Sequence, residues 1–457
     1  MKYTKFIVSA VVAAFLIVSC EMQQPTSPGN TGATDQSSLA KKSGVGEAAG
    51  DFIVEFTSGA AEFTATVEQL GGTVDFAHAA TGLAAVSGID DKTARKLGKA
   101  NGVKQVTRDL MIQWVNPDLQ VRQADAEELG IGDDESYFGY QWALQAISAP
   151  AAWEAGARGA GVRVAVIDGG ISKDHIDLKD NIDNGSSHSF VPGFAYYEDD
   201  PGFRHATHVA GIIAAEDNGI GTIGVAPYAT IIALKALQSG SGAFSWIINA
   251  ILYAADEADA DIINMSLGAV FPRNSLDAAK LNAALGHAMN YATQHGVTIV
   301  AAAGNNGADF DHAGPWVSMP AEAQHVIAVS ATGPVGFAYG GTDFDRPASY
   351  TNYGQSLVDF AAPGGDDTLY PDSTDWYLDM VISPGAGTAG YYFADGTSMA
   401  APHVAGVAAL IIEHNGGSMA PAQVIAQLKQ TSDDLGKPGN DDYYGQGRVN
   451  AYRAVTE

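Results

Sequence analysis

The chain is poor in two kinds of residue, and each shortage excludes a class of structure or partner. Its only cysteine is Cys20, so no disulfide can form within the chain. Lysine and arginine number 24 against 52 aspartates and glutamates, and the formal net charge of −28 would repel phosphate backbones. We therefore expect no nucleic-acid partner. The 53 glycines, in contrast, predict many tight turns.

The N-terminus lacks an apolar run long enough to cross a membrane. Residues 6–19 are mostly apolar and follow Lys2 and Lys5, but a membrane span needs about 20 such residues. The run therefore predicts a signal peptide over residues 1–20. Its end, IVSC, resembles the lipobox of bacterial lipoproteins, whose cysteine is lipidated and becomes the mature N-terminus. A plain secretory signal with an incidental Cys20 is the alternative, and either one takes the protein out of the cytoplasm.

Composition divides the next part of the chain into three segments. Residues 21–50 are rich in Ser, Thr, Gly and Pro and predict a flexible linker. Residues 51–115 alternate as strand, helix, strand, strand, helix and strand, which predicts a small α+β domain of the split ferredoxin-like kind. On this pattern alone it could be any small binding domain. Residues 116–139 carry an acidic cluster with few apolar anchors, and predict an exposed acidic connector that proteases can reach.

From residue 140 to residue 457, apolar strands alternate with helical stretches. This order predicts an α/β domain with a mostly parallel sheet and helices on both faces. The predicted central strands are VRVAVID, TIIALKAL, DIINMSL and VTIVAAAG. In such sheets, ligands bind beyond the carboxyl ends of the strands. Those ends carry Asp168, Ser266 to Gly268, and Gly304 with Asn305.

Three side chains in this domain fit nucleophilic catalysis. Asp168 ends a strand, His205 begins a predicted helix, and Ser398 lies in GTSMAAPHVAG where a loop becomes a helix. A serine becomes a good nucleophile when an imidazole takes its proton and a carboxylate orients that imidazole. The alternative for Ser398 is an ordinary N-capping serine, and for Asp168 a helix cap.

The motifs that hold these residues resemble those of the subtilisin-like serine proteases, or subtilases. VAVIDGGI resembles the aspartate motif, HATHVAG the histidine motif and GTSMAAPHVAG the serine motif, and NMSLG and AAAGNNG also match. The resemblance implies a serine endopeptidase in which Asp168 orients the imidazole, His205 is the general base and Ser398 is the nucleophile. It also implies that the Asn305 amide stabilises the oxyanion; a turn residue in GNNG is the alternative.

The sequence departs from the family pattern at two positions. Ala206 stands where the histidine motif normally has glycine, and Gly169 where the aspartate motif usually has threonine or serine. We expect activity to survive both. His208 invites a metal-binding interpretation, but no HExxH motif accompanies it, so we interpret it, with His175 and His403, as structural.

The resemblance also implies how substrates and the small domain interact with the peptidase. Residues 51–115 resemble the inhibitor-type propeptide of subtilases, which assists folding and occupies the cleft until it is cleaved. Peptide substrates would pair with main-chain segments that contain no charged residue, which argues for broad or apolar preference in the residue before the cut. Ser318 would lie near the floor of that pocket. The implied substrate-binding residues are Ser266, Leu267, Gly268, Ala303 and Gly304.

A calcium site is the one cofactor that the resemblance implies, and none is expected for catalysis. The turn after the histidine helix resembles the calcium-binding loop of the family, and Asp177 matches its carboxylate ligand. A turn held only by local hydrogen bonds is the alternative. The implied ligands are Asp177, Glu216, Asn218, Ile220 and Thr222.

Together these observations predict an extracytoplasmic serine endopeptidase, a monomer, made as an autoinhibited lipoprotein precursor. Because the lipid on Cys20 lies before the propeptide, a cut after the propeptide would release the peptidase from its anchor. One alternative is a catalytically silent subtilase fold that serves as a scaffold. Another is a processing protease dedicated to a single cellular partner.

Overall fold

The computed structural model describes residues 51–116, 119–124, 135–199 and 203–457. The predicted signal peptide, Cys20 and the linker lie outside the described residues. Within the described part, no helix combines the length and the apolar character that a membrane crossing requires.

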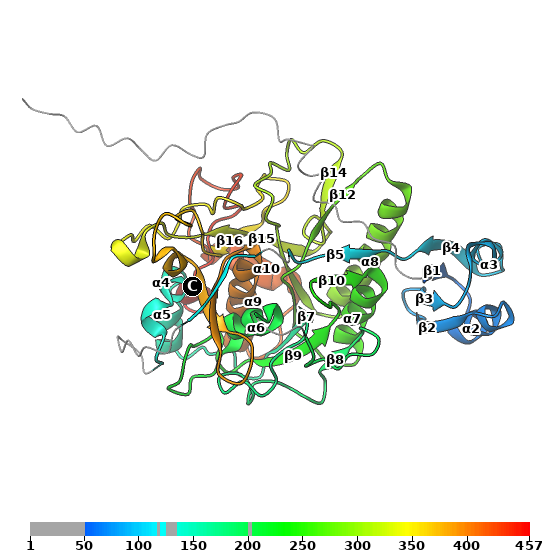
Figure 1. Ribbon diagram of the computed structural model, residues 1–457, viewed down its shortest axis with the longest axis horizontal. Coiled ribbons are helices and arrows are strands. Elements are labelled where there is room, and N and C mark those ends of the chain that lie inside the picture. Colours follow the sequence, from blue (N-terminus) through cyan, green and yellow to red (C-terminus); the bar gives the residue numbers. More distant parts are fainter. Residues whose placement is uncertain (1–50, 117–118, 125–134, 200–202) are drawn as a thin grey trace, which may run out of the picture. The chain divides into compact units, whose positions relative to one another are not determined.

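Residues 51–108 form a small α+β unit with the predicted order of elements (Figure 1). All strand pairs are antiparallel, and the sheet order is β2-β3-β1-β4. The Asp90 side chain accepts a hydrogen bond from the Thr93 backbone and so caps the second helix. The elements are β1 (Phe52–Phe56), α2 (Ala60–Gln69), β2 (Thr73–His78), β3 (Leu83–Ser87), α3 (Asp91–Leu97) and β4 (Val103–Arg108).

A seven-stranded parallel sheet forms the centre of the larger domain, as the sequence predicts (Figure 1). Its order is β16-β15-β13-β11-β7-β9-β8. The strands are β7 (Arg163–Asp168), β8 (His188–Ser189), β9 (Thr230–Lys235), β11 (Ile262–Met265), β13 (Thr298–Ala302), β15 (Val326–Thr332) and β16 (Phe360–Pro363).

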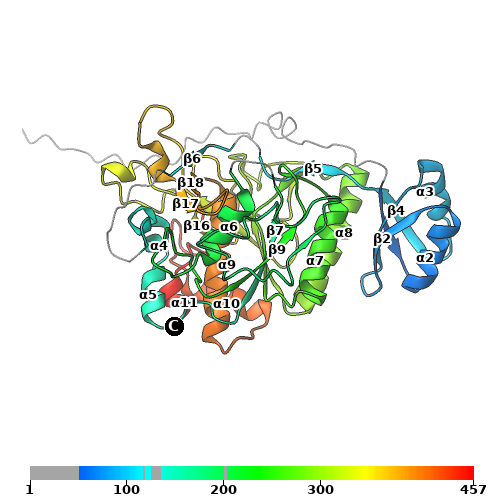
Figure 2. The same ribbon diagram turned by 60° about the horizontal axis from the view of Figure 1, so that its bottom comes forward.

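Both faces of this sheet are covered by helices, because both faces of its strands are apolar. Val164 and Val166 of β7 belong to the core that also contains α6 (His205–Ala214) and α9 (Thr397–His414). Ala165 and Ile167 point to the opposite face and join the core of α7 (Phe244–Asp256) and α8 (Leu276–Gln294). Figure 2 shows α6 and α9 beside one part of the sheet and α7 and α8 beside another. Smaller helices are α4 (Trp142–Ala146), α5 (Ala149–Glu154), α10 (Pro421–Thr431), α11 (Ala451–Ala454), η1 (Phe138–Tyr140), η2 (Phe337–Tyr339) and η3 (Trp376–Asp379).

Short strands outside the central sheet connect distant parts of the sequence. β5 (Met111–Gln113), which follows the small unit, pairs with β10 (Ser241–Ala243). β6 (Val121–Gln123) pairs with β18 (Tyr391–Ala394), which also pairs with β17 (Val381–Pro384). β12 (Ala269–Pro272) pairs with β14 (Trp316–Met319). The segment expected to be an exposed connector therefore contains a strand, because β18 offers it an unpaired edge.

Candidate active site

An aspartate and a histidine meet at the carboxyl end of the central sheet. Asp168 is the last residue of β7 and His205 the first of α6, and both are buried. His205 Nδ1 lies 2.8 Å from Asp168 Oδ2, while the Gly169 backbone donates to the other carboxylate oxygen. The carboxylate therefore favours the tautomer with its proton on Nδ1. Nε2 is buried without a hydrogen-bond partner among the described residues, so its lone pair is available to accept a proton.

Ser398 lies in the first turn of α9, where the helix dipole favours negative charge. Its hydroxyl donates to the Ser266 carbonyl at 3.0 Å, and the Ser266 hydroxyl donates to the Ser398 carbonyl at 2.7 Å. The Ser398 carbonyl is free for this bond because Pro402, four residues later, has no N–H to donate to it. The pair of bonds fixes the backbone of Ser398 against the end of β11.

The Asn305 side chain is oriented toward the start of the same helix. Its Oδ1 accepts hydrogen bonds from the Thr397 backbone and hydroxyl, at 2.9 and 2.6 Å. The Nδ2 group is therefore left to donate elsewhere. Gly396 has φ +147°, and a Cβ placed there would lie 3.3 Å from Asn305 Nδ2. Glycine at this position keeps the space beside the amide open.

Ser398 and Asn305 line a cavity of about 330 Å³, which we call the cleft. Of the predicted substrate-binding residues, Leu267, Gly268 and Gly304 line it directly. The Ala303 carbonyl accepts a bond from the hydroxyl of Ser318, which also lines the cleft. Ser266 contributes its carbonyl bond to Ser398. The other lining residues are Gln113, Trp114, Val115, Asn116, Leu119, Ala269, Val270, Ala302, Asn306 and Thr397.

The segment that follows the small unit enters this cleft, and sequence reasoning did not find its key residue, Trp114. The Trp114 backbone donates to the Gly240 carbonyl and accepts from the Gly268 backbone, at 2.9 and 3.0 Å. Its indole N–H donates to the Gly242 carbonyl at 2.8 Å. The ring centroid lies 5.0 Å from that of Phe244. The segment is therefore held between two backbone edges as an added strand.

One departure from the family pattern has a structural explanation. A Cβ on Gly169 would lie 2.7 Å from the Asp199 carboxylate, which accepts a hydrogen bond from the Gly170 backbone at 2.9 Å. A side chain at 169 would have to displace this carboxylate, so the close approach of Asp199 favours glycine there. Ala206 is buried within α6, and nothing in the structure explains its replacement of glycine.

The other histidines of these motifs are bonded to backbone carbonyls. His208 Nε2 lies 2.9 Å from the Tyr392 carbonyl, His175 Nε2 3.0 Å from the Gly390 carbonyl, and His403 Nδ1 2.8 Å from the Met399 carbonyl. Burial lowers the pKa of His208 to about 3 and that of His403 to about 4. Both rings therefore stay neutral at ordinary pH and add no charge beside His205.

The five predicted calcium-binding residues lie in and around one loop, residues 216–222. Asp177 is fully buried and accepts bonds from the Thr222 backbone and hydroxyl, at 2.9 and 3.0 Å. The Asn218 amide bonds Glu216, and its carbonyl oxygen accepts from the Ile220 backbone. Burial raises the pKa of Asp177 to about 8, because charging it there is costly. A cation would offset that cost, so these residues fit calcium.

Sequence reasoning missed a further carboxylate at this loop, Glu135. It is buried, and its Oε1 accepts a hydrogen bond from the Gly219 backbone. No local pattern marks it, because the contact joins residues 84 positions apart. No cluster of three His, Cys, Asp or Glu side chains able to hold a metal occurs in the described ranges, so calcium here would also need backbone and amide oxygens.

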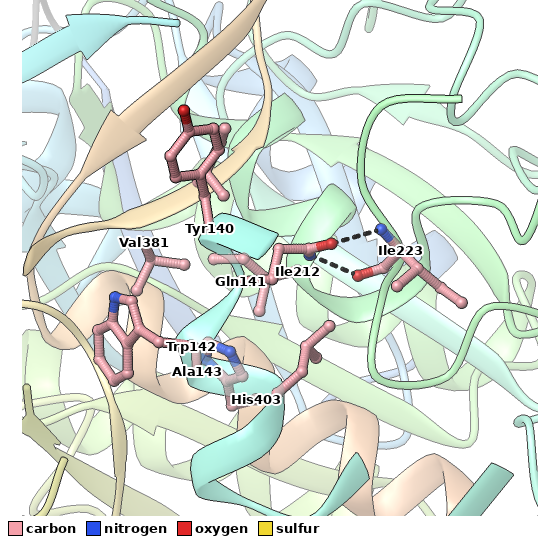
Figure 3. Close-up of a pocket in the computed structure, with 10 residues that line it drawn as sticks. Tyr140, Gln141, Trp142, Ala143, Ile212, Ile223, Val381 and His403 are labelled. Atoms are coloured by element: carbon pink, nitrogen blue, oxygen red, sulfur yellow. Dashed lines mark hydrogen bonds between the residues drawn. The ribbon is translucent and has the colours of Figure 1, made fainter. Parts of the chain in front are cut away.

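The same loop is tied to the start of the larger domain. In Figure 3 the Gln141 side chain faces the backbone of Ile223 beside a small internal cavity. Its amide donates to the Ile223 carbonyl at 2.8 Å and accepts from the Ile223 N–H at 3.0 Å. Two bonds from one side chain fix the end of the loop.

Comparisons with known proteins agree with this fold. The model of the subtilase family (Peptidase_S8) matches residues 159–447. The chain is 40% identical over 316 residues to Subtilisin Savinase of Lederbergia lenta, covering 69% of this chain and 98% of that protein. It is 37% identical over 355 residues to Subtilisin E of Bacillus subtilis, covering 77% and 78%.

A solved structure, the epidermin leader peptide processing serine protease (EpiP) of Staphylococcus aureus, has a similar fold. It superposes with a TM-score of 0.73 at 24% identity, over 89% of this chain and 97% of that one. Fold and relatives together define a serine endopeptidase of the subtilisin type. The chain belongs to the subtilase family.

Proposed function

We propose that Ser398, His205, Asp168 and Asn305 carry out peptide-bond hydrolysis through an acyl-enzyme intermediate. The observation that carries this proposal is the 2.8 Å contact of His205 with Asp168 at the carboxyl end of the central sheet, in a fold whose cleft is lined by Ser398 and Asn305. In this mechanism His205 Nε2 takes the hydroxyl proton as Ser398 attacks the peptide carbonyl. The same nitrogen then donates the proton to the leaving amine.

The remaining two residues stabilise the charges that this reaction creates. Asp168 stabilises the imidazolium, since its Oδ2 already accepts from Nδ1. The Asn305 amide and the N-terminus of α9 stabilise the oxyanion of the tetrahedral intermediate. A water molecule, activated by His205 in the same way, then attacks the acyl carbon and releases the second product.

Fluorophosphonate labelling of residues 21–457 tests the nucleophile, with the product masses read by mass spectrometry. We expect one label on the wild-type chain and none on the Ser398→Ala variant. Absence of label on both, even after trace trypsin treatment, would favour the alternative of a silent scaffold. Hydrolysis of casein would argue against the second alternative, a processing protease with a single partner.

We also propose that the small unit acts as an autoinhibitory propeptide. The support is the position of the segment after it, since Trp114 pairs with Gly240 and Gly268 and, with its neighbours, forms part of the wall of the cleft that Ser398 also lines. A peptide bond in the residues between β5 and β6 is therefore the expected site of self-cleavage. Loss of the small unit in the wild type, with retention in Ser398→Ala, is the expected result.

Three further properties follow from the sequence and complete the proposal. A lipid on Cys20 would anchor the extracytoplasmic precursor, and self-cleavage would release a monomeric peptidase. Mass spectrometry of the chain expressed with its leader, beside Cys20→Ser, tests the anchor; a mature peptidase that still carries lipid would contradict release. Calcium held by Asp177, Glu216, Asn218, Ile220 and Thr222 would fix the loop that Gln141 also holds.

A further inference from the structure

The strand β6 marks where a peptide continues beyond the reacting serine. The chain enters the cleft through β5, which pairs with β10, and Leu119 lines the cleft beside Ser398. Two residues later it pairs antiparallel with β18, which ends four residues before Ser398. Because the chain runs in this direction, β18 pairs with the part of a peptide that follows the cut, the leaving-group side.

One residue of β6 makes a specific side-chain contact on that side. Arg122 opposes Phe393 in the ladder, so the two side chains lie on the same face. The Arg122 guanidinium carbon lies 5.4 Å from the centre of the Tyr377 ring, in the range of a cation–π interaction. The Tyr377 ring in turn packs edge-on against Phe393, with 5.0 Å between their centroids. A side chain opposite Phe393 is therefore directed onto Tyr377.

The surrounding sequence favours a positive charge at this position. No lysine or arginine occurs between Arg346 and Lys429, a stretch that contains both Tyr377 and Ser398. Residues 366–379, which include η3, contain five aspartates. Their field attracts a cation to the ring, whereas a carboxylate in the same place would meet both the negative ring face and these charges.

We propose that β18 and Tyr377 form a leaving-group-side subsite that selects arginine or lysine in peptide substrates. The selected position is the one that pairs opposite Phe393, which Arg122 occupies in the uncut chain. The proposal rests on the endopeptidase activity and on the assignment of Ser398 as nucleophile, and does not require the small unit to be inhibitory.

Steady-state kinetics test this selection, on enzyme that is expressed as the full chain and has matured by self-cleavage. Fluorogenic peptides carry Arg, Gln or Glu at one position after the cut, and this position is moved from the first to the sixth, so that the experiment finds the one that lies opposite Phe393. We expect kcat/KM to be about five- to tenfold higher for Arg than for Glu at low salt, falling toward about twofold in 0.5 M NaCl. Tyr377→Leu should lower the Arg preference and Tyr377→Phe should keep it. Tyr452→Leu, an exposed tyrosine on α11, is the matched control. Equal rates for Arg, Gln and Glu at every position tested would overturn the proposal.

A second measurement does not depend on turnover. In the uncut Ser398→Ala chain, hydrogen exchange of the amides of residues 121–124 reports how firmly β6 is held. Arg122→Gln or Tyr377→Leu should speed this exchange about three- to fivefold, and Arg95→Gln on α3 should not. Unchanged exchange in both variants would overturn the subsite. If exchange is faster in these variants but the wild-type chain cleaves no peptide, the proposed catalytic function is wrong and the subsite stands.

Discussion

Replacing Trp114 by alanine should open the cleft of the uncut chain. The Trp114 side chain is buried, donates an indole hydrogen bond to the Gly242 carbonyl and packs against Phe244 and Phe271. Truncating a buried tryptophan costs about 3–5 kcal/mol, and each 1.4 kcal/mol is about a factor of ten in an equilibrium. The fraction of molecules with an open cleft should therefore rise about a hundred- to a few thousandfold.

The assay is peptide binding to the Ser398→Ala chain, followed by fluorescence anisotropy of a labelled peptide. An apparent Kd equals the intrinsic Kd divided by the fraction of molecules whose cleft is open. Trp114→Ala in this background should therefore lower the apparent Kd by about the same factor, until every cleft is open. In the Ser398→Ala chain that keeps Trp114, the segment competes with the added peptide for the cleft.

The control is Trp246→Ala, which removes a half-buried tryptophan from α7. It tests whether general loosening of the fold, rather than release of the cleft, explains tighter binding. Circular dichroism should show that both variants remain folded. If Trp114→Ala binds the peptide no more tightly than Trp246→Ala, the segment does not block the cleft and the autoinhibition proposal is wrong.

Three other changes have defined outcomes. Asn305→Ala should lower kcat about a hundred- to a thousandfold with little change in KM, and a loss confined to KM would contradict an oxyanion role. The raised pKa of Asp177 means that the folded chain keeps a proton that the unfolded chain releases between about pH 4 and 8, so the free energy of unfolding falls as pH rises through that window. Calcium should therefore raise Tm more at pH 8 than at pH 5, and an equal rise in Asp177→Asn would argue against the site. The pKa values of His208 and His403 are lowered in the folded chain, so unfolding takes up protons below about pH 6.5. Tm should therefore fall from pH 6 toward pH 4, and it should fall less steeply in His403→Gln. An equal fall in the wild type and in His403→Gln would contradict this reasoning.

The sequence predicted the elements that depend on local pattern. Alternating apolar strands and helices identified the parallel sheet, and the motifs around Asp168, His205 and Ser398 identified residues that the fold brings to one edge of it. The order of elements in residues 51–108 was also predicted, because each strand and helix there has its own apolar period.

Tertiary contacts decide what the sequence could not reveal. The strand β6 is three residues long, with the sequence Val-Arg-Gln, and forms because β18 offers it an edge. Glu135 reaches the loop at Gly219 from 84 residues away. Gly169 departs from the family pattern beside Asp199, which lies 30 residues further along the chain. None of these contacts produces a periodic pattern in the sequence.

The two hydrogen bonds between Ser266 and Ser398 have a consequence for the order of events during turnover. At rest the Ser398 hydroxyl points its proton at the Ser266 carbonyl, so it is not yet aligned with the imidazole. A peptide N–H that reaches this carbonyl competes for the same acceptor and releases the hydroxyl to turn toward His205. Nucleophile alignment would then follow substrate arrival. A fluorophosphonate, which offers no such N–H, would still label Ser398 completely, but at a lower rate than a peptide of equal reactivity acylates it.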